Sequence, residues 1–225
     1  MLQGHINQPA FSLEVIILKM VNNAIFVYLQ PESTTEKLIL PSTHINVSVD
    51  KNVDAAVRRC VFERLSCDAS YIEQVKTIGN ATRYPQKWMV TSIYFALVFE
   101  SREPQQDAWY PVSTLSQYSL AYDHLGVINS CLKRLRNKTQ YTSMPLHLMP
   151  NEFTMTELQL AYECLLDTFL DKKSFRRRML ESGLLLPLAR TRRGQNRPAQ
   201  LYQVKLGHII HHFSRNMHGS VKEEV

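Results

Sequence analysis

The stretch from Phe153 to Met179 reads FTMTELQLAYECLLDTFLDKKSFRRRM and decides how the C-terminal third of the chain folds. It opens on Thr154-Met-Thr-Glu157, which has the spacing of a capping box: the threonine begins a helix and the glutamate lies three residues on. The apolar residues that follow repeat at helical spacing and form one face: Leu158, Ala161, Tyr162 and Leu165. The pattern predicts a helix that packs one side against a core.

A second helix is expected soon after the first. Residues 167–170 are predicted to make a short turn, and Asp171 then caps the new helix. Phe175 and Met179 are four residues apart and face inward together, and Gly183 is suited to end the helix. This helix is expected to have an apolar inner side and a basic outer side.

Two strand-like runs that enclose a basic loop follow the helix pair. Residues 184–188 form the first run, and Pro187 restricts it to the edge of a sheet. Residues 189–200 form the loop, and residues 201–206 form the second strand. Helix, turn, basic helix and basic hairpin follow the order of a winged helix-turn-helix.

Positive charge is concentrated in this region. The chain has a formal charge of +6, and residues 171–197 hold nine lysines and arginines against two acids. A helix fits the major groove of double-stranded DNA, where arginine can pair with guanine or with phosphate. A merely solvated basic face is the competing interpretation, which the caps, the turn and the basic wing make less favourable. The residues expected to contact DNA are Thr154, Thr156, Lys172, Lys173, Arg176, Arg177, Arg192, Arg193 and Arg197.

The rest of the chain is predicted to form a separate α+β domain. Prolines at 145 and 150 interrupt regular secondary structure and indicate a domain boundary, so we place the domains at residues 1–148 and 149–225. Helical spacing predicts helices over 52–65 and 121–136. The predicted strands cover 13–20, 24–30, 37–40, 71–78, 88–99 and 109–112, and Asn22-Asn23 makes the first turn.

The chain resembles the family of Nudix-related transcriptional regulators of the NrtR type. The C-terminal resemblance rests on residues 153–159, on Asp171-Lys-Lys-Ser-Phe-Arg-Arg177, on Arg193-Gly194 and on residues 197–202. Looser landmarks appear upstream in the same order: residues 71–75, Arg83 with Pro85, Val90-Thr91 with Tyr94, residues 109–112 and residues 121–124. The resemblance covers about Leu13 to Tyr202.

This resemblance implies a Nudix-like α/β/α sandwich domain followed by a winged helix-turn-helix domain. It also implies a homodimer that binds a palindromic operator, usually as a repressor of NAD-metabolism or sugar-utilisation genes. Members of the family commonly sense ADP-ribose or a related nucleotide in the Nudix-like domain, so a nucleotide effector is expected here as well.

The helix over 52–65 lies where a Nudix box belongs, but its metal-binding carboxylates are replaced. Asp50 stands at the first Glu position of the box, and Arg58 stands at its Arg. The next Glu is Arg59, and the Glu-Glu pair has become Phe62-Glu63. The usual glycines are gone as well, with Leu65 after the pair and Pro41-Ser-Thr-His44 before the helix. One remaining carboxylate beside Arg59 does not suit Mg²⁺, so we expect no metal, no cofactor and no hydrolysis.

The effector pocket is less defined by the sequence. Family members often carry further arginines after the landmark proline, whereas this chain has Gln86, Lys87 and Trp88. The pocket has either moved to another effector or been filled to leave a dimerisation platform. In the competing interpretation, Arg58 and Asp123 form an internal salt bridge and Tyr94 belongs to the core. The candidate effector-binding residues are Arg58, Arg83, Lys87, Tyr94, Asp123 and His124.

Three function classes therefore compete. A dimeric DNA-binding regulator is favoured, a Nudix-type pyrophosphohydrolase is the alternative, and a scaffold with an incidental basic surface is the third. The N-terminus lacks a basic region followed by an apolar run, so we expect no signal peptide. No apolar run is long enough to span a membrane, and the four cysteines form no CxxC pair. We expect a cytoplasmic protein with reduced thiols.

Overall fold

A computed structural model describes residues 9–84, 88–99, 108–192, 198–205 and 210–217, and the backbone of 219–221. Contacts divide the chain into two compact units. The N-terminal unit holds Met1–Leu18, Val27–Leu97 and Pro104–Cys131; the C-terminal unit holds Lys19–Phe26, Val98–Glu103 and Leu132–Val225. The boundary placed after residue 148 stays a prediction. Among the described residues, no helix is long and apolar enough to cross a membrane.

The first unit is built on a mixed sheet with β1 at its centre. All residues from Ser12 to Leu18 are buried, which indicates that both faces of this strand are covered. β1 runs parallel to β7, and β6 and β7 are antiparallel. The sheet order is β6 (Tyr71–Asn80), β7 (Met89–Leu97), β1 (Ala10–Val21), β2 (Ala24–Tyr28) and β8 (Trp109–Pro111), with β5 (Ser42–Thr43) paired to β1.

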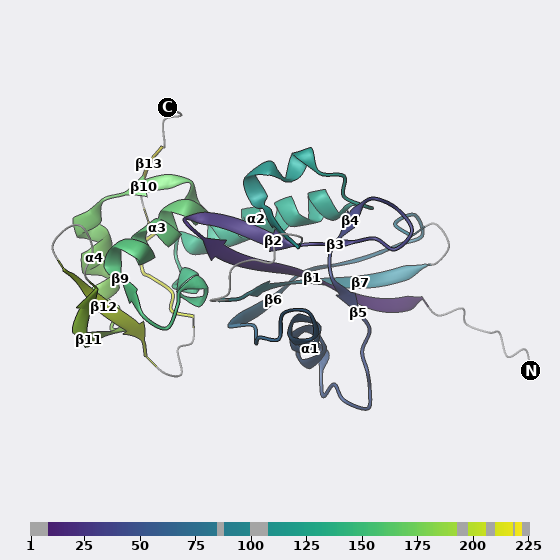
Figure 1. The fold of residues 1–225 in the computed structure, drawn as a ribbon, viewed down its shortest axis with the longest axis horizontal. Coiled ribbons are helices and arrows are strands. Elements are labelled where there is room, and N and C mark those ends of the chain that lie inside the picture. The colour runs from purple at the N-terminus through teal and green to yellow at the C-terminus, as the bar shows by residue number, and fades with distance from the viewer. Residues whose placement is uncertain are drawn as a thin grey trace, which may run out of the picture. The chain divides into compact units, whose positions relative to one another are not determined.

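Helices flank this sheet. α1 (Val53–Leu65) lies on one face and the first half of α2 (His124–Thr139) lies on the other (Figure 1). Asn52 begins α1, because its side chain accepts a hydrogen bond from the Ala55 amide at 2.8 Å. The sandwich inferred from the resemblance is confirmed. Shorter elements complete the connections: β3 (Gln30–Pro31), β4 (Leu38–Ile39) and the 3-10 helix η1 (Val112–Gln117).

The hairpin turn predicted at Asn22-Asn23 is also present. Both residues have positive φ, 48° and 62°, as a type I′ turn requires. Asparagine tolerates this left-handed conformation better than most residues. A two-residue turn of this kind matches the twist of antiparallel strands and so joins β1 directly to β2.

The second unit has the elements of a winged helix-turn-helix. They are η2 (Met144–Leu148), β9 (Phe153–Thr154), α3 (Met155–Leu166), β10 (Thr168–Leu170), α4 (Lys172–Glu181), β11 (Leu185–Arg192), β12 (Ala199–Val204) and β13 (Gly219–Val221). β11, β12 and β9 form one antiparallel sheet, with β11 at its edge. Phe153, Leu158, Tyr162, Phe175 and Met179 belong to its core.

The helices of this unit begin as predicted. Thr154 accepts a hydrogen bond from the Glu157 amide at 3.2 Å, and the Glu157 carboxylate accepts one from the Thr154 amide at 2.7 Å. This completes the capping box. Asp171 caps α4 by accepting from the Ser174 amide at 2.9 Å. Gly183, with φ of +68°, follows the helix.

Two segments differ from the sequence-based expectation. Residues 168–170, predicted as a turn, form β10, which pairs with β13 near the C-terminus. β11 continues to Arg192, so Arg190 and Arg192 lie in a strand instead of a loop. A register shift between Pro187 and Thr191 lets the ladder with β12 resume past the proline.

Candidate functional site

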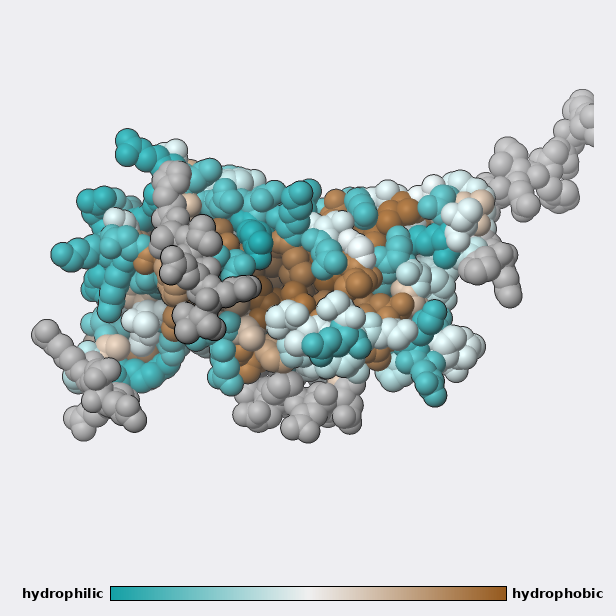
Figure 2. All heavy atoms as spheres, turned by 90° about the horizontal axis from the view of Figure 1, so that it is seen from above, coloured by the Kyte–Doolittle hydropathy of each residue, from teal (hydrophilic) through white to brown (hydrophobic). Residues whose placement is uncertain are grey.

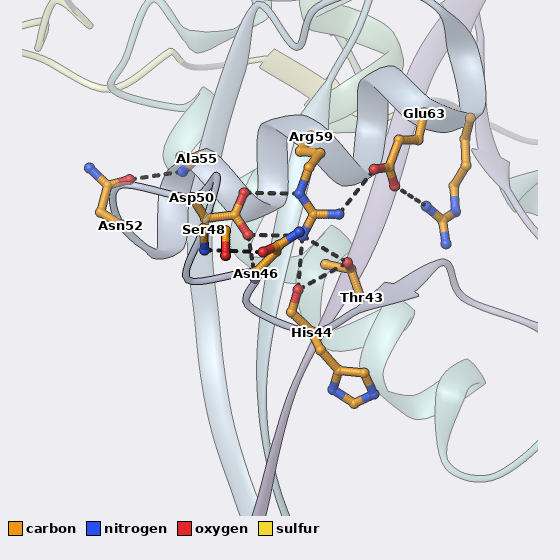
Figure 3. Close-up of polar contacts among 10 residues, drawn as sticks. Thr43, His44, Asn46, Ser48, Asp50, Asn52, Ala55, Arg59 and Glu63 are labelled. Carbon is orange, nitrogen blue, oxygen red and sulfur yellow. Dashed lines mark hydrogen bonds and ion pairs between the residues drawn. The ribbon is translucent and has the colours of Figure 1, made fainter.

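Arg59 lies on α1, at the position where the resemblance would place a metal-binding glutamate of the Nudix box. Its Nε and Nη2 donate to the two carboxylate oxygens of Asp50, both at 2.9 Å, and its Nη1 lies 3.0 Å from Glu63. Nη2 also donates to the His44 carbonyl at 2.8 Å and to the Thr43 hydroxyl at 3.3 Å. Figure 3 shows the guanidinium between these groups, with a dashed line to each partner.

Arg59 brings a positive charge to the two carboxylates on either side of it. The hydrogen bonds from Arg59 lower the pKa of Asp50, and those to Asp50 and Glu63 raise the pKa of Arg59. Asp50 and Glu63 are therefore both paired with a permanent cation. Within the described ranges, no group of three or more His, Cys, Asp or Glu side chains is arranged to hold a metal ion.

A second polar cluster lies around Glu14, in the middle of the apolar strand β1. Its side chain is 2% exposed and pairs with Arg83 at 2.7 Å. The Tyr84 hydroxyl donates to the same carboxylate, and Arg83 Nε donates to Asp123 at 2.8 Å. Burial by itself would raise the pKa of Glu14, but His124, Arg83 and Tyr84 together lower it to about 2. Glu14 is thus a buried anion.

His124 is held in one tautomer by its neighbours. Its Nδ1 accepts a hydrogen bond from the Leu40 amide at 3.1 Å, so Nδ1 carries no proton. The proton therefore sits on Nε2, which lies 3.5 Å from Glu14 Oε1. His124 orients Glu14 and the chain around Leu40, and it is 2% exposed.

One donor group of Arg83 has no hydrogen-bond partner among the described residues. Its side chain is only 4% exposed, and its buried Nη1 has no hydrogen-bond partner in this part of the chain. A buried unpaired donor on a cation favours an incoming oxygen from an anion or a carbonyl.

The structure brings three of the six proposed effector residues together: Arg83, Asp123 and His124. Asp123 pairs with Arg83, so the alternative of an Arg58–Asp123 salt bridge is wrong. Arg58 instead donates to the Ala69 carbonyl at 2.7 Å. Tyr94 is buried on β7, as the core interpretation expected, and Lys87 lies outside the described residues.

Glu14 and Tyr84 were missed by the sequence analysis. Glu14 is the single charged residue in the run Phe11-Ser-Leu-Glu-Val-Ile-Ile-Leu18. A carboxylate in a strand whose neighbours are apolar on both sides must be paired if the strand is buried. That mismatch was the available signal. Tyr84 follows Arg83 directly and had no signal of its own.

The basic helix α4 presents most of its cations to solvent. Lys172, Lys173, Arg176 and Arg177 are exposed, while Phe175 and Met179 fill the inner side. Arg176 leans toward β12 and donates to the Tyr202 hydroxyl at 3.3 Å. Figure 2 shows hydrophilic side chains over most of the end of the view that holds α3 and α4.

The other residues proposed for DNA contact are less uniform. Thr156 is exposed at the start of α3, whereas Thr154 is buried and its hydroxyl serves the capping box. Arg192 pairs with Glu157 and donates to the Glu152 carbonyl at 3.2 Å. These contacts tie the loop end of the β11–β12 hairpin to the start of α3 and the residues just before it. Arg193 and Arg197, at the tip of the predicted wing, lie outside the described residues.

A Nudix-like sandwich joined to a winged helix with an exposed basic helix defines a class of DNA-binding regulators. Comparisons with known proteins agree. Residues 145–204 match the model of the NrtR DNA-binding winged helix domain. The ADPR responsive transcriptional repressor NtrR of Acinetobacter baylyi is 40% identical over 182 residues, which span 78% of this chain and 73% of that protein. The chain belongs to the NrtR family of transcriptional regulators.

Solved structures of the Shewanella oneidensis NrtR protein are similar as well. Its complex with a 27mer DNA superposes with a TM-score of 0.85 at 30% identity, covering 92% of this chain and 99% of the other. Its separate NUDIX domain, solved with ADP ribose, matches with a TM-score of 0.50 at 26% identity over 57% of this chain and 89% of the other.

Proposed function

We propose that this protein is a transcriptional repressor that binds operator DNA through its winged helix and responds to ADP-ribose or a related nucleotide. The observation that carries the proposal is the exposed basic face of α4 on a winged-helix unit, in a chain whose Nudix-like helix holds Arg59 between its remaining carboxylates. Both the Acinetobacter and the Shewanella relatives support it.

The DNA interface is proposed to centre on Lys173 and Arg177, which face away from the buried side of α4. Lys172 and Arg176 extend it toward the β11–β12 hairpin, and Thr156 extends it toward the start of α3. The remaining predicted contacts, Thr154, Arg192, Arg193 and Arg197, stay proposals at the edge of this surface. Lysine and arginine contacts of this kind position the protein on phosphates and read guanine in the major groove.

The protein is proposed to lack pyrophosphohydrolase activity. Hydrolysis by this fold needs carboxylates that hold divalent metal and activate water. Here Arg59 pairs with both Asp50 and Glu63, and a guanidinium cannot bind or polarise water as a metal does. A scaffold without specific DNA binding is less well supported, because the exposed cations gather on a winged helix.

The effector is proposed to enter near Arg83. Its unpaired Nη1 suits a phosphate or ribose oxygen, and Asp123, 45% exposed beside it, can accept from a hydroxyl. His124 and Glu14 hold Arg83 in place from the buried side. Arg58, Tyr94 and Lys87 stay predicted pocket residues.

Assembly and cellular role complete the proposal. A homodimer would place two copies of α4 on the half-sites of a palindromic operator. The regulated genes are proposed to serve NAD metabolism or sugar utilisation, in the cytoplasm where the chromosome is. Sedimentation of the purified protein tests the dimer directly, and a monomer at all concentrations would contradict it.

The testing experiment is a gel-shift assay with the DNA upstream of the protein's own gene and its neighbours. ADP-ribose and NAD are added in separate lanes, and an unrelated duplex of equal length is the control. Specific binding released by ADP-ribose supports both parts of the proposal. Specific binding that neither nucleotide changes keeps the regulator but removes these effectors, and equal binding to all duplexes contradicts an operator-binding protein.

A further inference from the structure

A polar groove of about 490 Å³ lies within the C-terminal unit, along one side of α4. One wall is the helix face that carries Ser174, Arg177, Arg178 and Glu181, at the spacing i, i+3, i+4 and i+7. The opposite wall is the chain segment 211–215, which we call the C-terminal wall. It brings Arg215 to the groove.

Main-chain hydrogen bonds fix the C-terminal wall to the unit. In the middle of the wall, the Phe213 amide donates to the Tyr141 carbonyl at 2.8 Å, and just past the wall the Met217 amide donates to the Gln140 carbonyl. The His211 amide donates to the Ser143 hydroxyl at 2.8 Å. Met217 is itself buried in the core. The wall is therefore built into the fold, although it lies beyond residue 204, where the family model ends.

Arg178 joins the two walls. Its Nη1 donates to the Arg215 carbonyl at 2.8 Å, and its guanidinium lies 5.8 Å from the centre of the Phe213 ring. The contact uses the main chain of Arg215, so the Arg215 side chain remains exposed at the rim. The groove is thus lined by three arginines, two on α4 and one on the C-terminal wall, against the single carboxylate of Glu181, and it has an excess of positive charge.

We infer that this groove binds a phosphate of the DNA backbone, on the side of α4 opposite the wing. This inference rests on the proposed DNA-binding function. An α-helix with its side chains is about 10–12 Å wide, and the major groove is about 12 Å wide, so both backbones pass close to the helix flanks. Arg176 faces the β12 side of α4, and the groove supplies cations and serine hydroxyls on the other side.

Substitution of Arg215 by Gln in the full-length protein tests the inference. Binding is measured by fluorescence anisotropy, at several salt concentrations, on a duplex from the gene's own upstream region and on an unrelated duplex. If a phosphate contact is lost, binding to both duplexes should weaken equally, by about 3- to 10-fold. The magnitude of the negative slope of log K against log salt should also decrease by about 1. The Arg178–carbonyl contact is preserved in R215Q, so the thermal unfolding midpoint should stay unchanged.

Two further variants make the result specific. Lys133→Gln removes one positive charge from an exposed position on α2 that does not line the groove, and should leave affinity and slope unchanged. Glu181→Gln removes the carboxylate from the groove and should strengthen binding to both duplexes. Wild-type affinity and slope in R215Q overturn the inference, as does an equal loss in K133Q. No DNA binding by the wild-type protein overturns the proposed function itself.

Discussion

At Arg59, one guanidinium contacts two carboxylates, a hydroxyl and a backbone carbonyl. The planar fork of arginine matches the two oxygens of Asp50, which lysine cannot do. Several partners also surround a single charged group at Glu14, where Arg83, Tyr84 and His124 all lie next to one buried carboxylate. In both places a buried or half-buried charge persists because its partners are fixed by neighbouring strands and helices.

Removal of the Arg59 guanidinium should destabilise the N-terminal unit. In Arg59→Ala, Asp50 and Glu63 lose their shared cation, and the midpoint of urea unfolding should fall. Arg59→Lys should lie between wild type and alanine, because it keeps the charge and loses the fork. Adding Asp50→Asn to Arg59→Ala should recover part of the loss. Identical midpoints for all four proteins would show that these contacts do not contribute to stability.

Glu14 should make the stability depend on pH in the acid range. Its folded pKa of about 2 lies below the unfolded value near 4.5, so its contribution is complete above about pH 5 and declines as pH falls toward 2. The difference corresponds to roughly 3 kcal/mol. Glu14→Gln should remove this component, leaving a flatter curve of unfolding free energy between pH 5 and 2.5. Parallel curves for the two proteins would contradict the assignment.

The elements differ in how well the sequence predicts them. β1 is a long apolar run, while α1, α3 and α4 show helical periodicity and begin at capping residues, and the sequence predicted all four. β9, β10 and β13 are two or three residues long and depend on partners far along the chain, such as Phe169 with Ser220. No local pattern specifies such pairs. The Glu14 cluster was missed for the same reason, because Glu14 and Arg83 meet only after β1 and the end of β6 are placed in the sheet.

The capping box at the start of α3 should contribute to the stability of the C-terminal unit. Thr154→Ala removes the acceptor for the Glu157 amide and should lower the unfolding free energy by about 1 kcal/mol. Thr154→Ser keeps the hydroxyl and serves as the matched control. Chemical denaturation followed by far-ultraviolet circular dichroism measures both. Loss of DNA affinity in the serine variant, with stability unchanged, would assign Thr154 a role beyond capping.

The exposed basic face of α4 is expected to contribute directly to operator binding. Arg177→Ala and Arg176→Ala should each weaken operator binding by about 1–3 kcal/mol. Arg177→Ala should cause the larger loss of affinity, because Arg176 already uses one of its donor groups in a hydrogen bond to Tyr202. Titration of labelled operator at fixed salt measures both, with Lys133→Gln as the control. Unchanged binding in both arginine variants would contradict the placement of α4 as the recognition helix.

At the scale of the whole molecule, the chain joins two units with separate chemistries. The first unit has a Nudix-like fold, and its sequence predicts that glycines as well as carboxylates of the Nudix box are missing, as in Pro41-Ser-Thr-His44. The winged unit carries the positive charge. The order and type of both domains could be inferred from sequence through the family resemblance, whereas the groove beside α4 could not, because Arg215 lies outside every recognised motif.

Restoring two carboxylates should therefore not restore an enzyme. The variant Arg59→Glu/Phe62→Glu is expected to show no fast metal-dependent hydrolysis of ADP-ribose, because the glycine turns around the helix are also missing. Release of AMP and ribose 5-phosphate in the presence of Mg²⁺ or Mn²⁺ measures this, with an authentic Nudix hydrolase as the positive control. Rapid turnover by the double variant would show that the backbone is still competent.

The guanidinium between Asp50 and Glu63 also makes this part of the fold independent of its surroundings. A glutamate in place of Arg59 would put three acidic side chains next to one another, and only an ion taken from solution could then compensate them. Arg59 is instead a counter-ion that is covalently part of the chain, so its charge stays with the fold at any concentration of divalent metal.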